Sequence, residues 1–524
     1  MKKRFNVTGT CRREEHYMMD ERRRVGEALE MIERGEYFVI HRPRQFGKTT
    51  LLRLLASELG RRQEYQVILL NFQGIDAQSH QSDGAFAQTV VEELARYFEF
   101  ADRSIYQVIA SEWGGVKSMN ELSLFITRLV EVINKRVVLL IDEVDASSEY
   151  DSFLRFLGVL RTKYLHRDLA QHKTFHSVVL AGVYDIKLLK FKLRHPEEGQ
   201  YNSPWNIASE FKVVMEFYGE EIRYMLEEYA REEGVEMGLG EISERLYYYT
   251  SGHPFLVSKL CKVIAEEVVS RRGGVLRWTL EDVEEGVQRL LKETNTNFDS
   301  LIKNIENHQE LYELVYRILI KGEVVPYNAH TPLMRLGTMY GIFKESQRGL
   351  SIHNRLYEQL IYSYMTDRAL EKGKLGEGHY AGAQFVKGDG SLDMNVVLRK
   401  FQLFMKEQYS RRSRSLIERE WRLIFLAFLK PIINGRGYDF KEVETSEEKR
   451  LDIVVTYLRW KYLIELKLWR GERSHARGLE QLSQYLDIYG LRQGWLVIFD
   501  DRQHPSWKEE VILYKGKEIF AVWV

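Results

Sequence analysis

Short apolar runs rich in β-branched residues alternate with amphipathic stretches over the N-terminal part of this chain. The apolar runs lie at residues 37–40, 67–72, 137–141, 177–181 and 213–217. Continuous apolar strands that alternate with helices are typical of a parallel sheet covered by helices on both faces. We therefore predict that the chain begins with an α/β domain built on a parallel sheet.

Composition excludes several classes of protein. Of the 524 residues, 44% are hydrophobic and 29% are charged, which supplies packed cores and argues against a disordered chain. The longest apolar run, at residues 423–429, is far too short to cross a membrane. The 2 cysteines cannot build a disulfide framework or a cysteine zinc site. We expect a soluble cytoplasmic protein with no membrane partner.

The segment HRPRQFGKTT at residues 41–50 follows the first apolar run and begins a helical pattern. A strand, a tight loop and a helix N-terminus form the phosphate cradle of a P-loop. Lys48 is expected to meet the β- and γ-phosphates of ATP, and Thr49 to hold Mg²⁺. Arg42 replaces the first glycine of the pattern, so a chance Gly-Lys-Thr at a helix start is the alternative. The residues predicted to bind the nucleotide in this loop are Arg44, Gln45, Phe46, Gly47, Lys48, Thr49 and Thr50.

A second motif, VVLLIDE at residues 137–143, is an apolar strand that ends in two carboxylates. In P-loop ATPases the first carboxylate, here Asp142, supports Mg²⁺, and the second, here Glu143, orients or activates the attacking water. Ligands of open α/β sheets bind at the carboxyl ends of strands, where this pair lies. Two solvated charges that cap a strand are the weaker alternative.

With both motifs present, the chain resembles the prokaryotic AAA-like ATPases with an Arg-Pro-Arg-x-Phe-Gly-Lys loop, a group near the AAA+ and STAND ATPases. Further matching segments are LAGVYD at 180–185, NSPWNIA at 202–208 and TSGHPFLVS at 250–258. The resemblance covers residues 5–365, and in this group an arginine at position 42 is usual. It implies ATP and Mg²⁺ as cofactors, and a homo-oligomer or a closing lid that completes the site.

Two residues of this region keep two interpretations each. The resemblance places Asp185 where a sensor residue approaches the γ-phosphate, but a carboxylate that caps a strand end is equally consistent with the sequence. His253 lies in Gly252–Pro254, which looks like the Gly-x-Pro lid motif of STAND proteins. It either contacts phosphate or holds the turn, and the structural role is favoured.

The C-terminal part carries a second set of charged residues. In IELKL at residues 464–468, alternation places Glu465 and Lys467 on one face of a strand. Asp452 begins an earlier apolar run, and a hairpin that turns at residues 458–460 would bring it beside Glu465. Two carboxylates provide the hard oxygen ligands that Mg²⁺ prefers, and a nearby lysine can orient a water.

This arrangement resembles the PD-(D/E)xK nuclease fold over residues 395–524. The resemblance implies that Glu420 is the early helical acid of that fold, and that Gln481 and Tyr485 form its Gln-x-x-x-Tyr pair on one helix face. Leu451 stands where the fold often has proline. A solvated strand edge with its charges pointing outward is the alternative for Glu465 and Lys467.

The charge balance of the C-terminal part fits a nucleic-acid partner, most simply DNA. From Phe385 onward there are 25 basic and 20 acidic residues, a net charge of +5, whereas the whole chain is neutral. Arg470, Arg473 and Arg477 follow the carboxylate strand, and they either meet phosphates or lie on a solvated helix face.

The predicted architecture is therefore α/β, with five segments along the chain. They are a P-loop ATPase core (1–219), a helical lid (220–300), a winged-helix-like module (301–372), a glycine-rich linker (373–384) and a nuclease-like α/β domain (385–524). A structural role of the winged-helix-like module is favoured over DNA binding, because its expected wing has few basic residues.

These observations predict an ATP-hydrolysing protein whose Mg²⁺-dependent nuclease domain cleaves nucleic acid under the control of the ATPase. By analogy, such fusions serve defence against phage or mobile elements. The alternative is a nucleotide-dependent signalling or scaffold ATPase whose C-terminal domain binds nucleic acid without cutting it.

Overall fold

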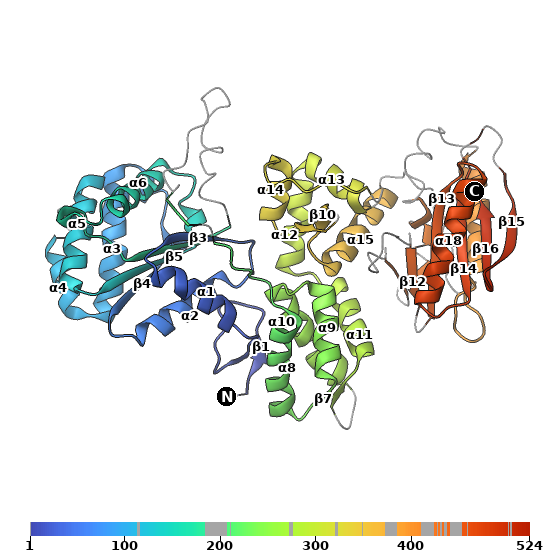
Figure 1. Cartoon of the computed structure of the whole chain (residues 1–524), viewed down its shortest axis with the longest axis horizontal. Helices are drawn as coiled ribbons and strands as arrows, with labels where there is room; N and C mark the ends of the chain where they lie inside the picture. Colours follow the sequence, from blue (N-terminus) through green and yellow to red (C-terminus); the bar gives the residue numbers. More distant parts are fainter. Residues whose placement is uncertain are drawn as a thin grey trace. The chain divides into compact units, whose positions relative to one another are not determined.

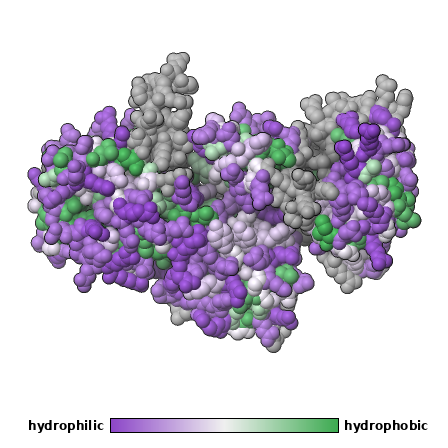
Figure 2. All heavy atoms as spheres, in the orientation of Figure 1, coloured by the Kyte–Doolittle hydropathy of each residue, from purple (hydrophilic) through white to green (hydrophobic). Residues whose placement is uncertain are grey.

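The structure is a computed structural model, and it divides the chain into two compact units. The first unit comprises Met1–Tyr312 and Val324–Glu358, and the second comprises Glu313–Glu323 and Gln359–Val524. The residues that the structure describes are 2–112, 116–183, 207–209, 211–271, 276–319, 323–347, 349–371, 385–409, 424–426, 428–429, 432–433, 437–440, 453–457, 460–500, 502 and 506–524. Among them, no helix is both long and apolar enough to cross a membrane. Figure 2 shows a mostly hydrophilic face, with hydrophobic side chains in scattered spots.

A four-stranded parallel sheet organises the first unit, as the alternating pattern predicts. Its strand order is β3 (Tyr37–His41), β6 (Ser177–Gly182), β5 (Arg136–Asp142) and β4 (Tyr65–Asn71). The fifth apolar run is not a strand. After one bridge between Phe38 and Ser209, residues 211–217 continue as an extended segment with alternating burial and no strand partner among the described residues.

Two apolar cores lie on opposite faces of this sheet, because alternate residues of each strand point in opposite directions. Phe38 and Ile40 pack with α1 (Arg22–Glu33) and α2 (Lys48–Gly60). Tyr37 and Val39 pack on the other face with helices α3 (Asp83–Ala101), α4 (Arg103–Glu112), α5 (Met119–Ile133) and α6 (Asp151–Leu165). Figure 1 shows the strands between these two groups of helices. The sheet is covered on both faces, as expected for parallel strands.

Helices replace strands after the sheet, again as the sequence predicts. The first group is α8 (Gly219–Glu233), α9 (Leu239–Thr250), α10 (Pro254–Val263) with a π-helical continuation (Ile264–Val269), and α11 (Leu280–Lys292). Helices α12 (Thr296–Glu306), α13 (Gln309–Leu319), α14 (Pro332–Met339) and α15 (Arg355–Glu371) follow. Strands β9 (Phe343–Ser346) and β10 (Gly349–Ile352) form an antiparallel hairpin between α14 and α15.

A tight turn between α9 and α10 depends on glycine. Gly252 has a φ of 70°, and a Cβ atom there would lie 1.9 Å from the carbonyl oxygen of Phe217. The Gly252 carbonyl accepts a hydrogen bond from the Phe217 N–H at 2.9 Å. Only glycine permits this approach, so the turn that contains His253 packs directly on the end of the extended segment 211–217.

The second unit contains a mixed six-stranded sheet. Its order is β11 (Gly437–Phe440), β12 (Ile453–Tyr457), β13 (Trp460–Leu468), β14 (Gln493–Phe499), β16 (Lys517–Trp523) and β15 (Glu509–Tyr514). Helix α18 (Glu472–Ile488) packs on one face through an apolar cluster that includes Leu463, Leu482 and Leu496 (Figure 1). Helix α16 (Met394–Tyr409) covers the other face, where Arg399 lies over the Phe520 ring.

The hairpin predicted around residues 458–460 is present. Strands β12 and β13 pair antiparallel from Tyr457↔Trp460 to Ile453↔Ile464. This register is the one that the predicted approach of Asp452 to Glu465 requires, although Asp452 itself lies outside the described residues. Glu420, the expected helical acid, also lies outside them.

Candidate functional site

The loop at residues 42–47 joins β3 to α2 and has the backbone conformation of a phosphate cradle. Gln45 and Gly47 have φ values of 62° and 78°, and Gly47 caps the N-terminus of α2. Lys48 is buried, and its Nζ donates to the carbonyl oxygens of Arg42 and Pro43 at 3.0 Å each. The loop therefore curls around the ammonium group, with the helix N-terminus facing the same region.

The carboxylates of the second motif share this region with Lys48. Asp142 ends β5 as a buried side chain, and its Oδ1 accepts a hydrogen bond from the Glu143 N–H at 3.0 Å. Burial raises the pKa of Glu143, the charge of Asp142 adds to this, and the charge of Lys48 opposes it. Burial lowers the pKa of Lys48, and the charges of Glu143, Asp145 and Asp142 oppose that shift. These mutual influences place one cation and three carboxylates in one electrostatic environment.

Asp145 is a member of this site that the sequence interpretation missed. Its Oδ2 accepts a hydrogen bond from the Val183 N–H at 2.6 Å. A Cβ atom at Gly182 would lie 2.9 Å from its Oδ1. Asp145 thus connects the loop after β5 to the end of β6, and the third acid of the DEVD run at residues 142–145 was the available signal. Asp185, the predicted sensor, lies outside the described residues.

Arg42 does not enter the phosphate cradle that its position suggests. Its guanidinium donates to the carbonyl oxygens of His41 and Val213, both at 2.9 Å. Burial lowers the pKa of this guanidinium, and the charge of Glu216 opposes the shift. The side chain therefore points away from the cradle and joins the P-loop to the extended segment 211–217, which we call the strap.

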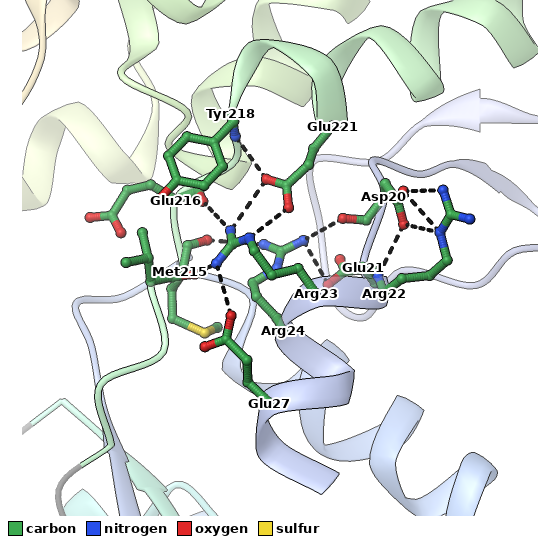
Figure 3. A network of polar contacts seen from close by, with 11 residues as sticks. Asp20, Glu21, Arg22, Arg23, Arg24, Glu27, Met215, Glu216, Tyr218 and Glu221 are labelled. Atoms are coloured by element: carbon green, nitrogen blue, oxygen red, sulfur yellow. Dashed lines mark hydrogen bonds and ion pairs between the residues drawn. The ribbon is translucent and has the colours of Figure 1, made fainter. Parts of the chain in front are cut away.

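Two arginines of α1 hold the rest of the strap, as Figure 3 shows for Met215 and Glu216. Arg23 donates to the carbonyl oxygens of Val214 at 3.0 Å and Glu216 at 3.1 Å. Arg24 is buried and donates to the carbonyl oxygen of Met215 at 2.9 Å. With Arg42 on Val213, four consecutive backbone carbonyls accept from arginine side chains.

Acidic partners fix these arginines in place. Arg24 pairs with Glu21 at 2.8 Å and lies 3.3 Å from the centroid of the Phe217 ring. Arg23 pairs at 2.9 Å with Glu221, in the first turn of α8. The network therefore joins α1, the strap and the start of the helical group (Figure 3).

The tip of the P-loop packs against later, mostly helical parts of the first unit. Phe46 is buried, with its ring centroid 4.3 Å from that of His253 and 5.5 Å from that of His353. Gln45 Oε1 accepts a hydrogen bond from Asn297 Nδ2 at 2.8 Å, and Asn297 Oδ1 accepts one from the Tyr357 hydroxyl at 2.8 Å. The loop is thus in contact with three later segments of the chain.

His253 occupies the structural position that the sequence favoured. Its side chain is buried, and Nε2 lies 3.3 Å from the Tyr357 hydroxyl. Burial lowers the pKa of His253 to about 3, so the ring is neutral near pH 7. Glu216 of the strap accepts a hydrogen bond from His353 at 3.2 Å. Although burial alone would raise the pKa of Glu216, the hydrogen bond and charge of His353 lower it to about 2.

The second candidate site lies on the α18 face of β13. Glu465 is fully buried, and its Oε1 lies 2.6 Å from Lys467 Nζ. Lys467 Nζ also donates to Gln481 Oε1 of α18 at 3.2 Å. A Cβ atom at Gly478 would lie 3.2 Å from Lys467 Cγ, so this glycine lets the helix approach the lysine closely. The structure therefore brings Glu465, Lys467 and Gln481 together.

The other predicted residues of this second site are Tyr485, Asp452 and Glu420. Tyr485 is buried in the apolar core under α18. Asp452 and Glu420 lie outside the described residues. Among the described residues, no group of three or more His, Cys, Asp or Glu side chains is arranged to hold a metal ion. Glu465 fits Mg²⁺ chemically as a hard carboxylate ligand, and a second carboxylate remains a prediction.

The buried His253 gives a testable pH dependence. An unfolded histidine binds a proton near pH 6.5, whereas the folded His253 does so only near pH 3. The unfolded state therefore binds more protons in this interval, and stability falls as the pH falls from about 6.5 to about 3, by up to about 1.4 kcal/mol per pH unit. His253→Asn should make the dependence of the unfolding free energy on pH shallower, as measured by urea titration at pH 7, 6 and 5.

The same substitution at the exposed His330 is the control and should leave the slope unchanged. Equal slopes for the wild type and His253→Asn would contradict the neutral, buried state of His253.

Several solved structures are similar to this chain over about two thirds of its length. Among solved structures, a Walker-type ATPase of Pyrococcus abyssi is similar, with 14% identity, a TM-score of 0.45, and coverage of 68% of this chain and 99% of that chain. The RuvB Holliday junction branch migration motor of Thermotoga maritima has 16% identity and a TM-score of 0.33, covering 66% of this chain and 95% of its own. The ORC2 protein of Aeropyrum pernix has 12% identity and a TM-score of 0.37, covering 69% of this chain and 98% of its own.

At these identities and TM-scores, the likenesses carry no argument of their own. A search of curated proteins found no match. The family comparison is stronger, because the model of a family described as an AAA-like domain matches residues 14–363, well over half of the chain. The match includes the P-loop, the carboxylates of Asp142 and Glu143, the strap and the turn at Gly252. The chain therefore belongs to the AAA-like domain family.

Proposed function

We propose that this protein binds and hydrolyses ATP in its first unit and uses that cycle to control cleavage of nucleic acid, most simply DNA, by a Mg²⁺-dependent nuclease site in its second unit. The observation that carries the nuclease part is the buried Glu465 with Lys467 at 2.6 Å and Gln481 beside it. The ATPase part is supported by Lys48, Asp142 and Glu143 in one electrostatic environment.

In the first unit, Lys48 exchanges the carbonyl oxygens of Arg42 and Pro43 for phosphate oxygens when ATP binds. This exchange replaces two neutral acceptors with charged ones, which form stronger hydrogen bonds with an ammonium group. Thr49 and Asp142 would hold Mg²⁺, which when bound neutralises phosphate charge. Glu143 then holds the attacking water. Its raised pKa comes from burial and from Asp142, and a bound cation would reverse the second effect.

In the second unit, Glu465 and Asp452 would hold Mg²⁺, which when bound polarises the scissile phosphate. Lys467 Nζ lies 2.6 Å from Glu465 Oε1 and donates one of its three N–H groups to Gln481 Oε1. Another of these N–H groups can hold the attacking water. Because Glu465 is fully buried, its charge requires a cation close by, and Lys467 supplies one before any metal binds. Tyr485 and Glu420 have supporting roles in this proposal.

Control of the nuclease site would start at the P-loop tip. A change in the loop on ATP binding moves Phe46 against His253, which lies next to Tyr357 of α15. Helix α15 begins in the first unit and continues past Glu358 into the second. Tyr357 lies in the first turn of this helix, so a shift at Tyr357 acts on α15. A homo-oligomer that supplies a further cation to the ATP site is part of this proposal.

The buried Glu465 and Lys467 pair favours a nuclease over the alternative of a scaffold ATPase that binds nucleic acid without cutting. A domain that only binds nucleic acid has no need for an ionised carboxylate inside its core, because such a group is costly to bury and repels phosphate. The expected role in defence against foreign DNA stays a prediction from analogy.

The ATPase assignment predicts different results for two substitutions. Lys48→Ala should weaken ATP binding and reduce hydrolysis to background, because it removes the cation that the loop surrounds. Glu143→Gln should still bind ATP while turnover falls to background, since phosphate contacts remain and the water loses its acceptor. Phosphate release and binding of a fluorescent ATP analogue measure the two effects. Wild-type hydrolysis rates in both variants would refute the P-loop assignment.

The nuclease assignment predicts that some substitutions abolish DNA cleavage without weakening DNA binding. Asp452→Ala and Glu465→Gln should abolish Mg²⁺-dependent cleavage, because each removes a metal ligand. Both should bind DNA as well as the wild type or more tightly, because a negative charge near phosphate is lost. Lys467→Ala should slow cleavage by about 100-fold or more through the loss of water positioning.

Lys461→Ala is the control, since Lys461 is an exposed residue of the same strand. Filter binding and plasmid cleavage on the same preparations decide the outcome. If Asp452→Ala and Glu465→Gln cut at the wild-type rate, this cluster is not a nuclease site.

A further inference from the structure

An arginine at the carboxyl end of β14 is held with its flat guanidinium group in a fixed orientation. Asp500, whose side chain is fully buried, accepts hydrogen bonds from Arg502 Nε and Nη2, both at 2.7 Å. Asp500 also accepts one from the Ser506 N–H at 2.8 Å. Such a two-pronged contact fixes the plane of the guanidinium group. The side chain of Arg502 is nevertheless 52% exposed.

The Arg502 guanidinium lies over the indole ring of Trp469, 5.4 Å from its centroid. Trp469 directly follows β13, and its N–H donates to the Phe499 carbonyl at 2.8 Å, which continues the ladder between β13 and β14. The ring is half-buried and packs against the apolar cluster under α18, with His475 next to it at 6.0 Å. Trp469 and Arg502 therefore form a cation–π pair that rests on the core and reaches solvent.

This pair lies on the same face of the sheet as the candidate nuclease cluster. Glu465, Lys467 and Trp469 are alternate residues, and Lys467 and Trp469 both lie toward α18. Two residues along a strand span about 6.6–6.8 Å, so Trp469 is one such step beyond Lys467. The pair is also at the carboxyl ends of the neighbouring parallel strands β13 and β14, where ligands of α/β sheets bind.

The chemistry of the pair fits a flat ligand better than a phosphate. In Arg502, Asp500 occupies one of the two edges through which a guanidinium can grip a phosphate, the one that carries Nε and Nη2, and it balances the positive charge. The indole ring of Trp469 lies beside the guanidinium group. Nucleobases stack on aromatic rings and on guanidinium planes without regard to sequence.

We propose that Trp469, Arg502 and Asp500 form a stacking platform for an unpaired nucleobase next to the nuclease cluster. This inference rests on the proposed nucleic-acid function of the second unit. Bases inside a continuous duplex are stacked on each other and cannot reach such a platform without leaving the helix. The platform therefore selects nucleic acid with a single-stranded or frayed end over an uninterrupted duplex.

Binding without cleavage tests this proposal on the full chain. Dissociation constants are measured in EDTA by fluorescence anisotropy for a blunt duplex, for the same duplex with a single-stranded overhang, and for an overhang with abasic positions. Arg502→Lys keeps the charge and removes the plane, and Trp469→Ala removes the ring under it. Both should weaken binding of the overhang substrate by about 10-fold and leave the blunt duplex within about twofold. The wild type should bind the abasic overhang no more tightly than either variant does.

Arg399→Lys is a closely matched control. Arg399 is 50% exposed, pairs with Glu509 at 2.8 Å and lies 5.2 Å from the centroid of the Phe520 ring, but on the α16 face. It should leave all three affinities unchanged. Trp469→Phe guards against a folding defect in Trp469→Ala, because it keeps an aromatic face and part of the core contact. It should recover part of the affinity for the overhang substrate that Trp469→Ala loses.

The results that overturn the platform are distinct from those that overturn the nucleic-acid function. Equal losses of affinity for the blunt and overhang substrates would show that Arg502 acts only as a general positive charge. Unchanged affinity for the overhang after its bases are removed would exclude stacking. A wild type that binds none of the three oligonucleotides would instead refute the nucleic-acid function of the second unit, and the platform with it.

Discussion

The hydrogen bonds from arginine side chains to the backbone of the strap are the interaction on which the first unit depends. Arg42, Arg23 and Arg24 together satisfy the carbonyl oxygens of residues 213–216. Such carbonyls normally need a strand or helix partner when they lie against a core, so the arginines take the place of a fifth strand. They also join the strap to the P-loop through one arginine and to α1 through the other two.

The strap then connects the nucleotide loop to the later parts of the unit. Its Glu216 accepts from His353, and its Phe217 packs on the turn at Gly252 so closely that a methyl group there would overlap with backbone. Phe46 makes a second connection by packing on His253 and His353. Because interfaces of this kind shift as units and do not deform continuously, a change in the P-loop is expected to move the helical group as a whole.

The sequence predicted the parallel sheet, the helical group, the β12–β13 hairpin and the family, because hydrophobic periodicity and two motifs record these features directly. The prediction of a strand at residues 213–217 was wrong. In sequence, an apolar run with period two looks the same whether its carbonyls accept hydrogen bonds from a neighbouring strand or from distant side chains. The direction of the Arg42 side chain and the burial of Phe46 depend on segments far away in the chain. The same holds for Trp469 and Arg502, which follow different strands. Asp185, Asp452 and Glu420 stay predictions.

The central claim is that the ATP site controls a nuclease site in the same chain. The most direct measurement is the initial rate of plasmid cleavage with Mg²⁺, with and without saturating ATP, in the wild type and in Lys48→Ala. The account predicts that ATP changes the wild-type rate by about tenfold or more, as expected for allosteric coupling between two sites, and leaves the Lys48→Ala rate unchanged. Cleavage at the same rate with and without ATP in the wild type, or an equal response in the variant, would contradict it.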